Sequence, residues 1–451
     1  MPLAWIVLVL SVLLAAPLVV VSPRREARED LRGVWPFAAL VALVVLGCAG
    51  AFRFYQDDYQ YLVLARVDPF AVEPQRRLLG VQLPFFLAGG SAVGHVSLNL
   101  LALGGLVAAF GALLRTGGWT RREALVAGLL LASSAPVIEL LPWAAGFQQL
   151  AAWAAVFGAA AAMSSTARPR WACVLGGAGL SMLVVVIKWP LAPLAPLVGW
   201  LFGALAGRRA PHVAAAASAI AVGVGLALVA PPLESFGAGS GGVLSNLAEV
   251  VERLRPPVRA ALIALVVVAA LAAPSRERFV DAFFLGRSSR DAVRIGVVLG
   301  VVSLGPFLFN ARYFAAYYVG PALAFVAAPF ARALVALAPA GRTGAALALL
   351  FAVAWFPARA ATERWTDPRY AFTEASLADA SHALAEAPAS PEIGVIASCD
   401  GAALDRIWEG SEGEWGLRWA SGRLHTRFVR APRPTTLVYC GGFHLEIGRR
   451  R

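Results

Sequence analysis

Charge is scarce in this sequence. Asp, Glu, Lys and Arg together make up 15% of its 451 residues, whereas soluble domains carry about a quarter. This composition excludes an ordinary soluble globular domain. Among the 39 basic residues there is one lysine, Lys188, and apolar sequence flanks it on both sides.

Motifs that carry familiar chemistry are scarce as well. The chain has four cysteines and five histidines, without a Cys/His cluster at metal-ligand spacing, a Walker loop or a Ser-His-Asp pattern. We therefore expect no certain cofactor, although paired carboxylates could hold a divalent cation.

Long apolar runs are abundant. The chain is 59% hydrophobic, with a mean hydropathy of +0.69, and runs of about 18 residues recur up to residue 358, as in helical membrane proteins that cross the bilayer many times. The sequence predicts an all-α polytopic domain over residues 1–358, located in the cell (inner or plasma) membrane. Its about 12 predicted spans are 3–22, 34–52, 93–114, 123–141, 147–164, 172–188, 190–207, 213–230, 257–274, 294–310, 313–335 and 345–358.

The basic residues gather in alternate loops between these spans. Because cytoplasmic loops carry an excess of Lys and Arg, we expect all these loops on the cytoplasmic side and both termini outside. The net charge of +12 then reflects membrane orientation, and we expect no nucleic-acid partner. The basic loops are 23–33, 115–123, 165–171, 207–212, 275–294 and 339–344.

The last part of the chain, residues 359–451, changes character. A linker and a polar helix are followed by "EIGVIASC", "LRWASG", "TRFVR" and "TTLVYC", which alternate as strands do. We predict a small extracytoplasmic α/β domain. Cys399 and Cys440 each close a predicted strand, and an oxidising compartment permits a disulfide between them; two buried thiols are the alternative.

An acidic pair follows the second predicted span. In "FYQDDYQYL", Asp57 and Asp58 lie among three tyrosines, a composition typical of the membrane interface. A solvated loop beyond a helix end is one interpretation. The other is a general base, because two carboxylates in a partly desolvated site raise each other's pKa. After the pair, "RRLLGVQLPFFLAGGSA" could lie in the interface or dip into the bilayer.

From this pair onward the chain resembles the GT-C superfamily of membrane glycosyltransferases, which includes protein O-mannosyltransferases and lipid A aminoarabinose transferases. The resemblance covers about residues 34–335 and depends on the order of several segments. After "FYQDDYQYL" these are "RRLLGVQLPFFLAGGSAVGHVSLNLLALGG", "APVIELLPWAAGFQQL", "VVVIKWPLAPLAPL" and "NARYFAAYYVGPALAF". Two features depart from the family. Trp189 stands where many relatives have Glu, and "FQQL" lacks a basic residue that some relatives carry.

The resemblance implies a glycosyltransferase that takes a sugar from a polyprenyl-phosphate donor, a membrane lipid. Its acceptor would be a glycan, a lipid or a protein on the extracytoplasmic face. In such a transfer a base removes the acceptor proton and cations hold the leaving phosphate. The residues expected in these roles are the catalytic carboxylates Asp57, as the base, and Asp58 beside it, Arg312 and Lys188 at the donor phosphate, and Glu139 and Tyr313 at the substrate.

Structural roles compete with some of these assignments. Arg312 could anchor the chain at the interface, Lys188 could extend its ammonium towards water, and Glu139 could belong to an ion pair. His95 and Asn99, four residues apart on one helix face, are interpreted as contacts between helices.

Three other function classes remain open. A transporter or flippase for lipid-linked sugars would show two similar halves, and the chain has no such repeat. A polysaccharide polymerase or ligase would carry its chemistry in a late Arg- and His-rich loop, whereas the acids here lie in the first outer loop. A diverged relative without catalytic activity would fit the two departures.

Overall fold

We describe a computed structural model of the chain. It describes residues 9–15, 34–54, 57–67, 78–205, 210–229, 242–252, 254, 281, 286–308, 315–336 and 368–447. The predicted spans 257–274 and 345–358, as well as Arg312 and Tyr313, lie outside these residues.

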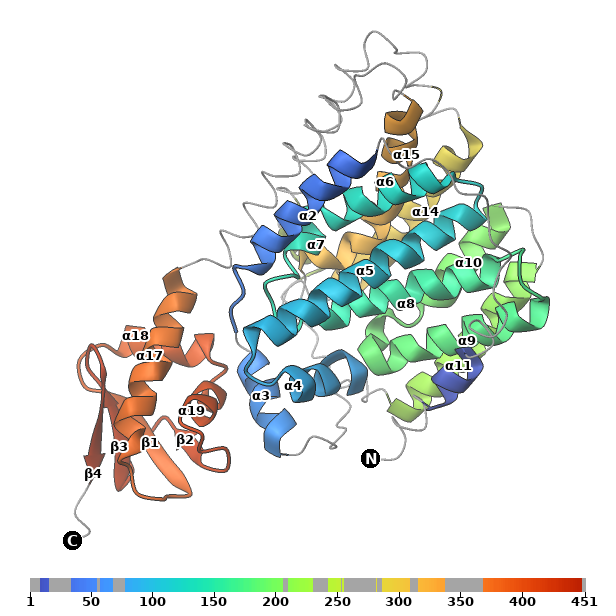
Figure 1. Ribbon diagram of the computed structural model, residues 1–451. Coiled ribbons are helices and arrows are strands. Elements are labelled where there is room, and N and C mark those ends of the chain that lie inside the picture. The colour runs from blue at the N-terminus through green and yellow to red at the C-terminus, as the bar shows by residue number, and fades with distance from the viewer. Residues whose placement is uncertain are drawn as a thin grey trace.

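A bundle of apolar helices forms the larger part of the molecule (Figure 1). The alanine-rich α8 lies in its middle and packs against α5, α9 and α10, since small side chains let membrane helices approach closely. The helices of the bundle are α2 (Trp35–Ala49), α5 (Ala92–Thr116), α6 (Arg121–Ala132), α7 (Ala135–Ile138), α8 (Gly146–Ser164), α9 (Arg170–Lys188), α10 (Leu194–Leu205), α11 (Ala210–Val229), α14 (Arg287–Leu304) and α15 (Gly320–Ala336).

Within the described part of the chain, four helices are long and apolar enough to cross a membrane: Ala92–Thr116, Arg170–Leu191, Pro211–Val229 and Tyr317–Ala336. The chain thus has the helices of a membrane protein. One predicted span is wrong as a continuous helix. In 123–141 the helix α6 ends at Ala132, where the hydroxyls of Ser133 and Ser134 donate to the carbonyls of Leu130 and Leu131.

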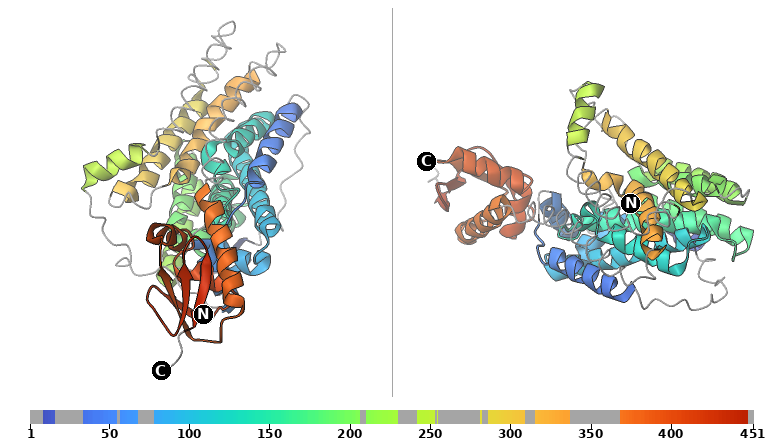
Figure 2. Two further views of the ribbon diagram at one scale, coloured as in Figure 1. Left: turned by 90° about the vertical axis from the view of Figure 1, so that its left-hand side faces the viewer. Right: turned by 90° about the horizontal axis from the view of Figure 1, so that it is seen from above.

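The bundle has two distinct ends. At one end the loop after α5, the end of α10 and the start of α14 line a common pocket, so parts of two basic loops, 115–123 and 275–294, meet there. At the other end lie the start of α5, the end of α9 and the C-terminal domain, which projects from the bundle in Figure 1 and in the right view of Figure 2. The shared end of these two basic loops agrees with the alternation that the sequence predicts.

The first long loop forms helices at the end that carries the C-terminal domain. It contains α3 (Asp57–Val67), a π-helical turn η2 (Leu78–Gln82) and α4 (Leu83–Ala88). The turn η2 packs against α8 and α9. A Cβ at Gly80 would lie 2.0 Å from the carbonyl oxygen of Ile187, so glycine is required there for the backbones to meet.

The C-terminal domain is an α/β unit with α17 (Pro368–Ala385), α18 (Gly401–Gly410) and α19 (Glu414–Ala420). Its sheet has the order β2-β1-β3-β4, with β1 parallel to both neighbours and β4 antiparallel to β3. The strands are β1 (Glu392–Ala397), β2 (Arg427–Val429), β3 (Thr435–Tyr439) and β4 (Phe443–Ile447).

Three of the four predicted strands are confirmed as β1, β2 and β3. The fourth, "LRWASG", is wrong, because those residues belong largely to helix α19. The disulfide between Cys399 and Cys440 is confirmed, with Cα atoms 5.2 Å apart, and it links the ends of the neighbouring strands β1 and β3.

Candidate functional site

The acidic pair occupies the first turn of α3. Two carboxylates favour a helix start there, because the helix dipole stabilises negative charge at its N-terminal end. Their surroundings nevertheless differ. Asp57 is exposed, whereas Asp58 is 0% exposed and faces the protein together with Tyr59. Asp57 is therefore accessible from solvent, whereas Asp58 is not.

Aromatic side chains surround the inward face of α3. The rings of Phe54 and Tyr59 lie 6.4 Å apart, those of Tyr61 and Phe85 5.4 Å, and those of Phe85 and His95 4.7 Å. Burial raises the pKa of the Tyr59 hydroxyl, and the charges of Glu374 and Asp58 raise it further. Tyr59 therefore stays protonated beside the acidic pair.

The C-terminal domain docks on α3 through α19, and α17 contacts the segment just before α3. The guanidinium of Arg66 lies 4.9 Å from the ring centroid of Trp419, and a Cβ at Gly90 would lie 2.9 Å from the same ring. Arg53 forms an ion pair of 3.5 Å with Glu374 on α17. The predicted first outer loop and the predicted outer domain thus form one continuous surface.

Two acids of the C-terminal domain respond to this docking. Burial raises the pKa of Glu374, and Arg53 partly opposes that shift. Burial also raises the pKa of Glu412, and the negative charge of Asp57 raises it further. Asp57 therefore faces the C-terminal domain across an acidic junction.

The loop that carries Glu139 is held by Asn99. Its amide Nδ2 donates to the carbonyl oxygens of Leu140, Leu141 and Trp143 at 3.3, 3.0 and 2.8 Å. The sequence predicts that Asn99 joins two helices, but its acceptors lie in the turn between α7 and α8, so it ties a helix to a loop. Glu139 itself follows α7 and is 8% exposed, so this acid lies inside the protein.

Lys188 ends α9 and turns into the protein. It is 2% exposed, and its Nζ donates to Oε1 of Gln149 on α8. The same nitrogen lies 5.5 Å from the ring centroid of Tyr317 and 5.0 Å from that of Tyr318, in cation–π geometry. An ammonium that extends to the interface would be exposed, so that alternative is wrong.

Trp143 lies between the region of Lys188 and the segment that leads to the acidic pair. Its ring lies 5.9 Å from Tyr317, and its backbone pairs with Arg53, four residues before Asp57. It also packs against both the bundle core and the cluster around α3. The structure thereby brings Asp58, Glu139 and Lys188 to the same end of the bundle. Arg312 and Tyr313 lie outside the described residues.

Sequence reasoning missed several members of this region, namely Gln149, Trp143, Tyr317, Tyr318 and Glu374. For Gln149 a signal existed, because a polar side chain in an apolar helix is expected to have a partner. The partner is Lys188, 39 residues further along the chain, and no spacing rule connects them.

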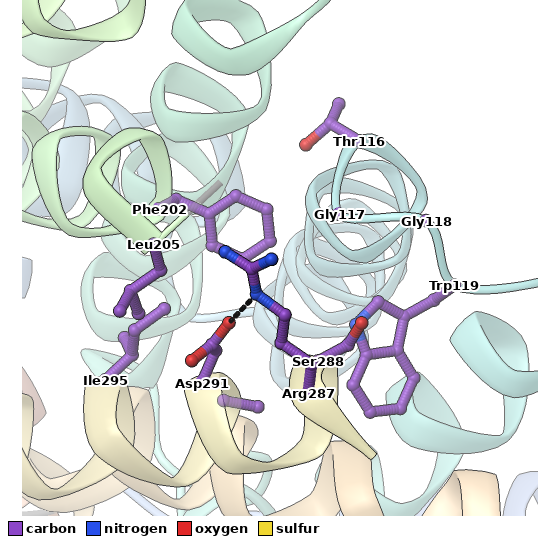
Figure 3. Close-up of a pocket in the computed structure, with 11 residues that line it drawn as sticks. Thr116, Gly117, Gly118, Trp119, Phe202, Leu205, Arg287, Ser288, Asp291 and Ile295 are labelled. Carbon is purple, nitrogen blue, oxygen red and sulfur yellow. Dashed lines mark ion pairs between the residues drawn. The ribbon is translucent and has the colours of Figure 1, made fainter. Parts of the chain in front are cut away.

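A polar pocket of about 260 Å³ lies at the opposite, basic end (Figure 3). Thr116, Trp119 and the ion-paired Arg287 and Asp291, 4.0 Å apart, line it. The helix α5 separates this pocket from the acidic pair by its full length, about 37 Å at 1.5 Å per residue. The pocket is therefore not part of the predicted site.

Among the described residues, no group of three or more His, Cys, Asp or Glu side chains could hold a metal ion. Comparison of the chain with protein-family models, with curated proteins and with solved structures found no match.

Proposed function

We propose that the protein is a membrane glycosyltransferase that uses a polyprenyl-phosphate sugar as donor and acts on the extracytoplasmic side. One observation carries the proposal. An accessible carboxylate, Asp57, and a buried cation, Lys188, lie at the same end of the bundle, opposite the basic loops that the positive-inside rule assigns to the cytoplasm.

The reaction divides between these two groups. The acceptor oxygen or nitrogen attacks the anomeric carbon of the donor, and the bond from that carbon to the phosphate oxygen breaks. Asp57 takes the acceptor proton, and the bonding electrons leave with the polyprenyl phosphate. Asp58, next to Asp57 in the chain, sets the position and the pKa of its neighbour.

Cations at the outer end hold the leaving group. Lys188 supplies one charge, and Arg312 supplies a guanidinium that binds phosphate through two hydrogen bonds. Glu139 and Tyr313 contact the sugar or the acceptor. The C-terminal domain, docked beside Asp57, forms one wall of the acceptor site.

A transfer assay tests the function class. Proteoliposomes that contain the purified protein receive a panel of radiolabelled polyprenyl-phosphate sugars together with membrane extracts as a source of acceptor. Transfer of label from at least one donor, with release of polyprenyl phosphate, supports the proposal. Movement of the intact donor across the bilayer without cleavage of its sugar–phosphate bond would instead indicate a flippase.

A further inference from the structure

A long groove runs between α2, α5 and α6 and reaches the basic end of the bundle. Its volume is about 630 Å³, within the range of small-molecule sites. Apart from Arg115 and Arg121, every lining residue is Ala, Val, Leu or Gly. A groove of this composition suits a hydrocarbon chain.

Small residues keep the groove open. Gly104, Ala108 and Gly111 follow one face of α5 at helical spacing. A Cβ at Gly104 would meet no atom within 4 Å, and at Gly111 the nearest is the carbonyl oxygen of Ala124 at 3.9 Å. Such residues usually allow a second helix to approach, but here the described chain leaves the space unfilled.

The groove is long enough for an acyl chain of one leaflet, which spans about 15 Å, half of the hydrocarbon core. It extends on α5 from Leu100 to Arg115, about 22 Å at 1.5 Å per residue. The hydrocarbon core of a bilayer is about 30 Å thick, so an acyl chain from one leaflet fits within the groove.

Both charges lie at one end of the groove. Arg115 is in the last turn of α5 and Arg121 begins α6, on either side of a short loop that belongs to the basic end. Guanidinium groups bind phosphate oxygens through paired, charge-assisted hydrogen bonds. Basic pockets between helices on the cytoplasmic side are known to bind anionic head groups.

We propose that this groove binds one acyl chain of an anionic phospholipid from the leaflet at the basic end, with its phosphate on Arg115 and Arg121. This site is separate from the proposed donor site, because Lys188 lies at the other end of the bundle. The lipid site does not depend on the proposed transfer reaction.

Native mass spectrometry tests the head-group contact. The protein is equilibrated in micelles with equal amounts of the anionic lipid POPG and the zwitterionic lipid POPC, and the lipids that stay bound are counted. We expect the wild type to retain about tenfold more POPG than POPC, because one strong contact changes the affinity by about that factor. The double variant Arg115→Gln/Arg121→Gln should lose this preference. The matched control Arg168→Gln/Arg170→Gln, at the same end but outside the groove, should keep it.

A second variant tests the groove itself. Gly104→Leu fills the open space and should abolish retention of the lipid with helix content unchanged. Gly223→Leu, which also meets open space but lies on α11, should retain it. Equal retention of POPG and POPC by the wild type, equal loss in the Arg168→Gln/Arg170→Gln control, or full retention by Gly104→Leu would each overturn the proposal.

Discussion

Lys188 is a cation inside the protein. Burial of an ammonium is costly unless polar groups and charges surround it. Gln149 and the two tyrosine rings contribute such contacts. A charge maintained at this cost in the folded protein suggests a function for it, and in the proposed reaction that function is to bind the donor phosphate.

Replacement of Lys188 separates function from stability. We expect Lys188→Met to raise the KM for the donor about tenfold, because the loss of one strong contact weakens binding by about that factor. The melting temperature should fall only slightly, because the substitution removes the cost of a buried ammonium but leaves Oε1 of the buried Gln149 without this donor. Steady-state kinetics and thermal unfolding of the same preparation measure both. A much lower melting temperature with an unchanged KM would assign Lys188 a structural role.

Gly80 allows the first outer loop to pack on α9. Gly80→Ala places a Cβ 2.0 Å from the carbonyl oxygen of Ile187, and overpacking of this kind costs about 1–3 kcal/mol. We therefore expect a lower melting temperature. Gly223→Ala, with nothing within 4 Å of its Cβ, serves as the control. Equal melting temperatures of the two variants would contradict the close approach of η2 and α9.

At this scale the sequence predicts the acidic pair and the lone lysine but not their orientations. Neighbouring residues on a helix point about 100° apart, so one of Asp57 and Asp58 had to face outwards. Which one does so depends on how α3 packs against η2 and α19. Those contacts join residues far apart in the chain, beyond what a local pattern contains.

At the scale of elements, the junction between α3 and the C-terminal domain depends on pH. Glu374 and Glu412 have pKa values above the ordinary 4.5 in the docked state, so docking favours their protonated forms. Docking is therefore strongest below pH 4.5 and weakens as the pH rises through the raised pKa values.

Hydrogen exchange can follow this junction. We expect the amides of α3 and α19 to exchange more slowly at pH 5 than at pH 7.5, after correction for the intrinsic rate. Glu412→Gln should reduce this difference, because it removes the repulsion with Asp57. Glu409→Gln, on the exposed face of α18, is the control. A difference that is the same in both variants would refute the role of Glu412.

The elements of the C-terminal domain show where pattern reading works. Strands β1 and β3 are apolar runs that end at cysteines, and both are correct. The prediction of a strand in "LRWASG", residues 417–422, is wrong because the segment alternates over a few residues only. With Trp415 included, Trp415 and Trp419 are four residues apart, and this spacing indicates the helix α19.

At the scale of the whole molecule, the two ends of the bundle differ in charge and covering. The described parts of the basic loops 115–123 and 275–294 meet at one end, and the C-terminal domain covers the other. The sequence predicts this polarity because basic residues occur in every second loop, and alternate loops lie on the same side of the membrane. The span count is harder to predict, since an apolar run such as 123–141 can break at two serines, as α6 does after Ala132.

Thiol labelling tests the orientation of the molecule. A cysteine introduced by Arg170→Cys, at the basic end, should be shielded from an impermeant maleimide in whole cells and react after permeabilisation. A cysteine introduced by Glu409→Cys, in the C-terminal domain, should react in intact cells. The natural cysteines do not interfere, because two are buried and two form the disulfide. The reverse labelling pattern would place the acidic pair in the cytoplasm.

The most direct test of the account is the rate of sugar transfer by Asp57→Asn. This variant keeps the size and hydrogen bonding of the side chain but removes its basicity. With a donor identified, we expect kcat to fall about 10²- to 10⁴-fold, as for the loss of a general base, with an unchanged melting temperature. Asp405→Asn, an exposed acid on α18, should transfer at the wild-type rate. Loss of a general base lowers kcat by at least about 10²-fold. A kcat of Asp57→Asn within about threefold of the wild-type value would therefore contradict the central claim.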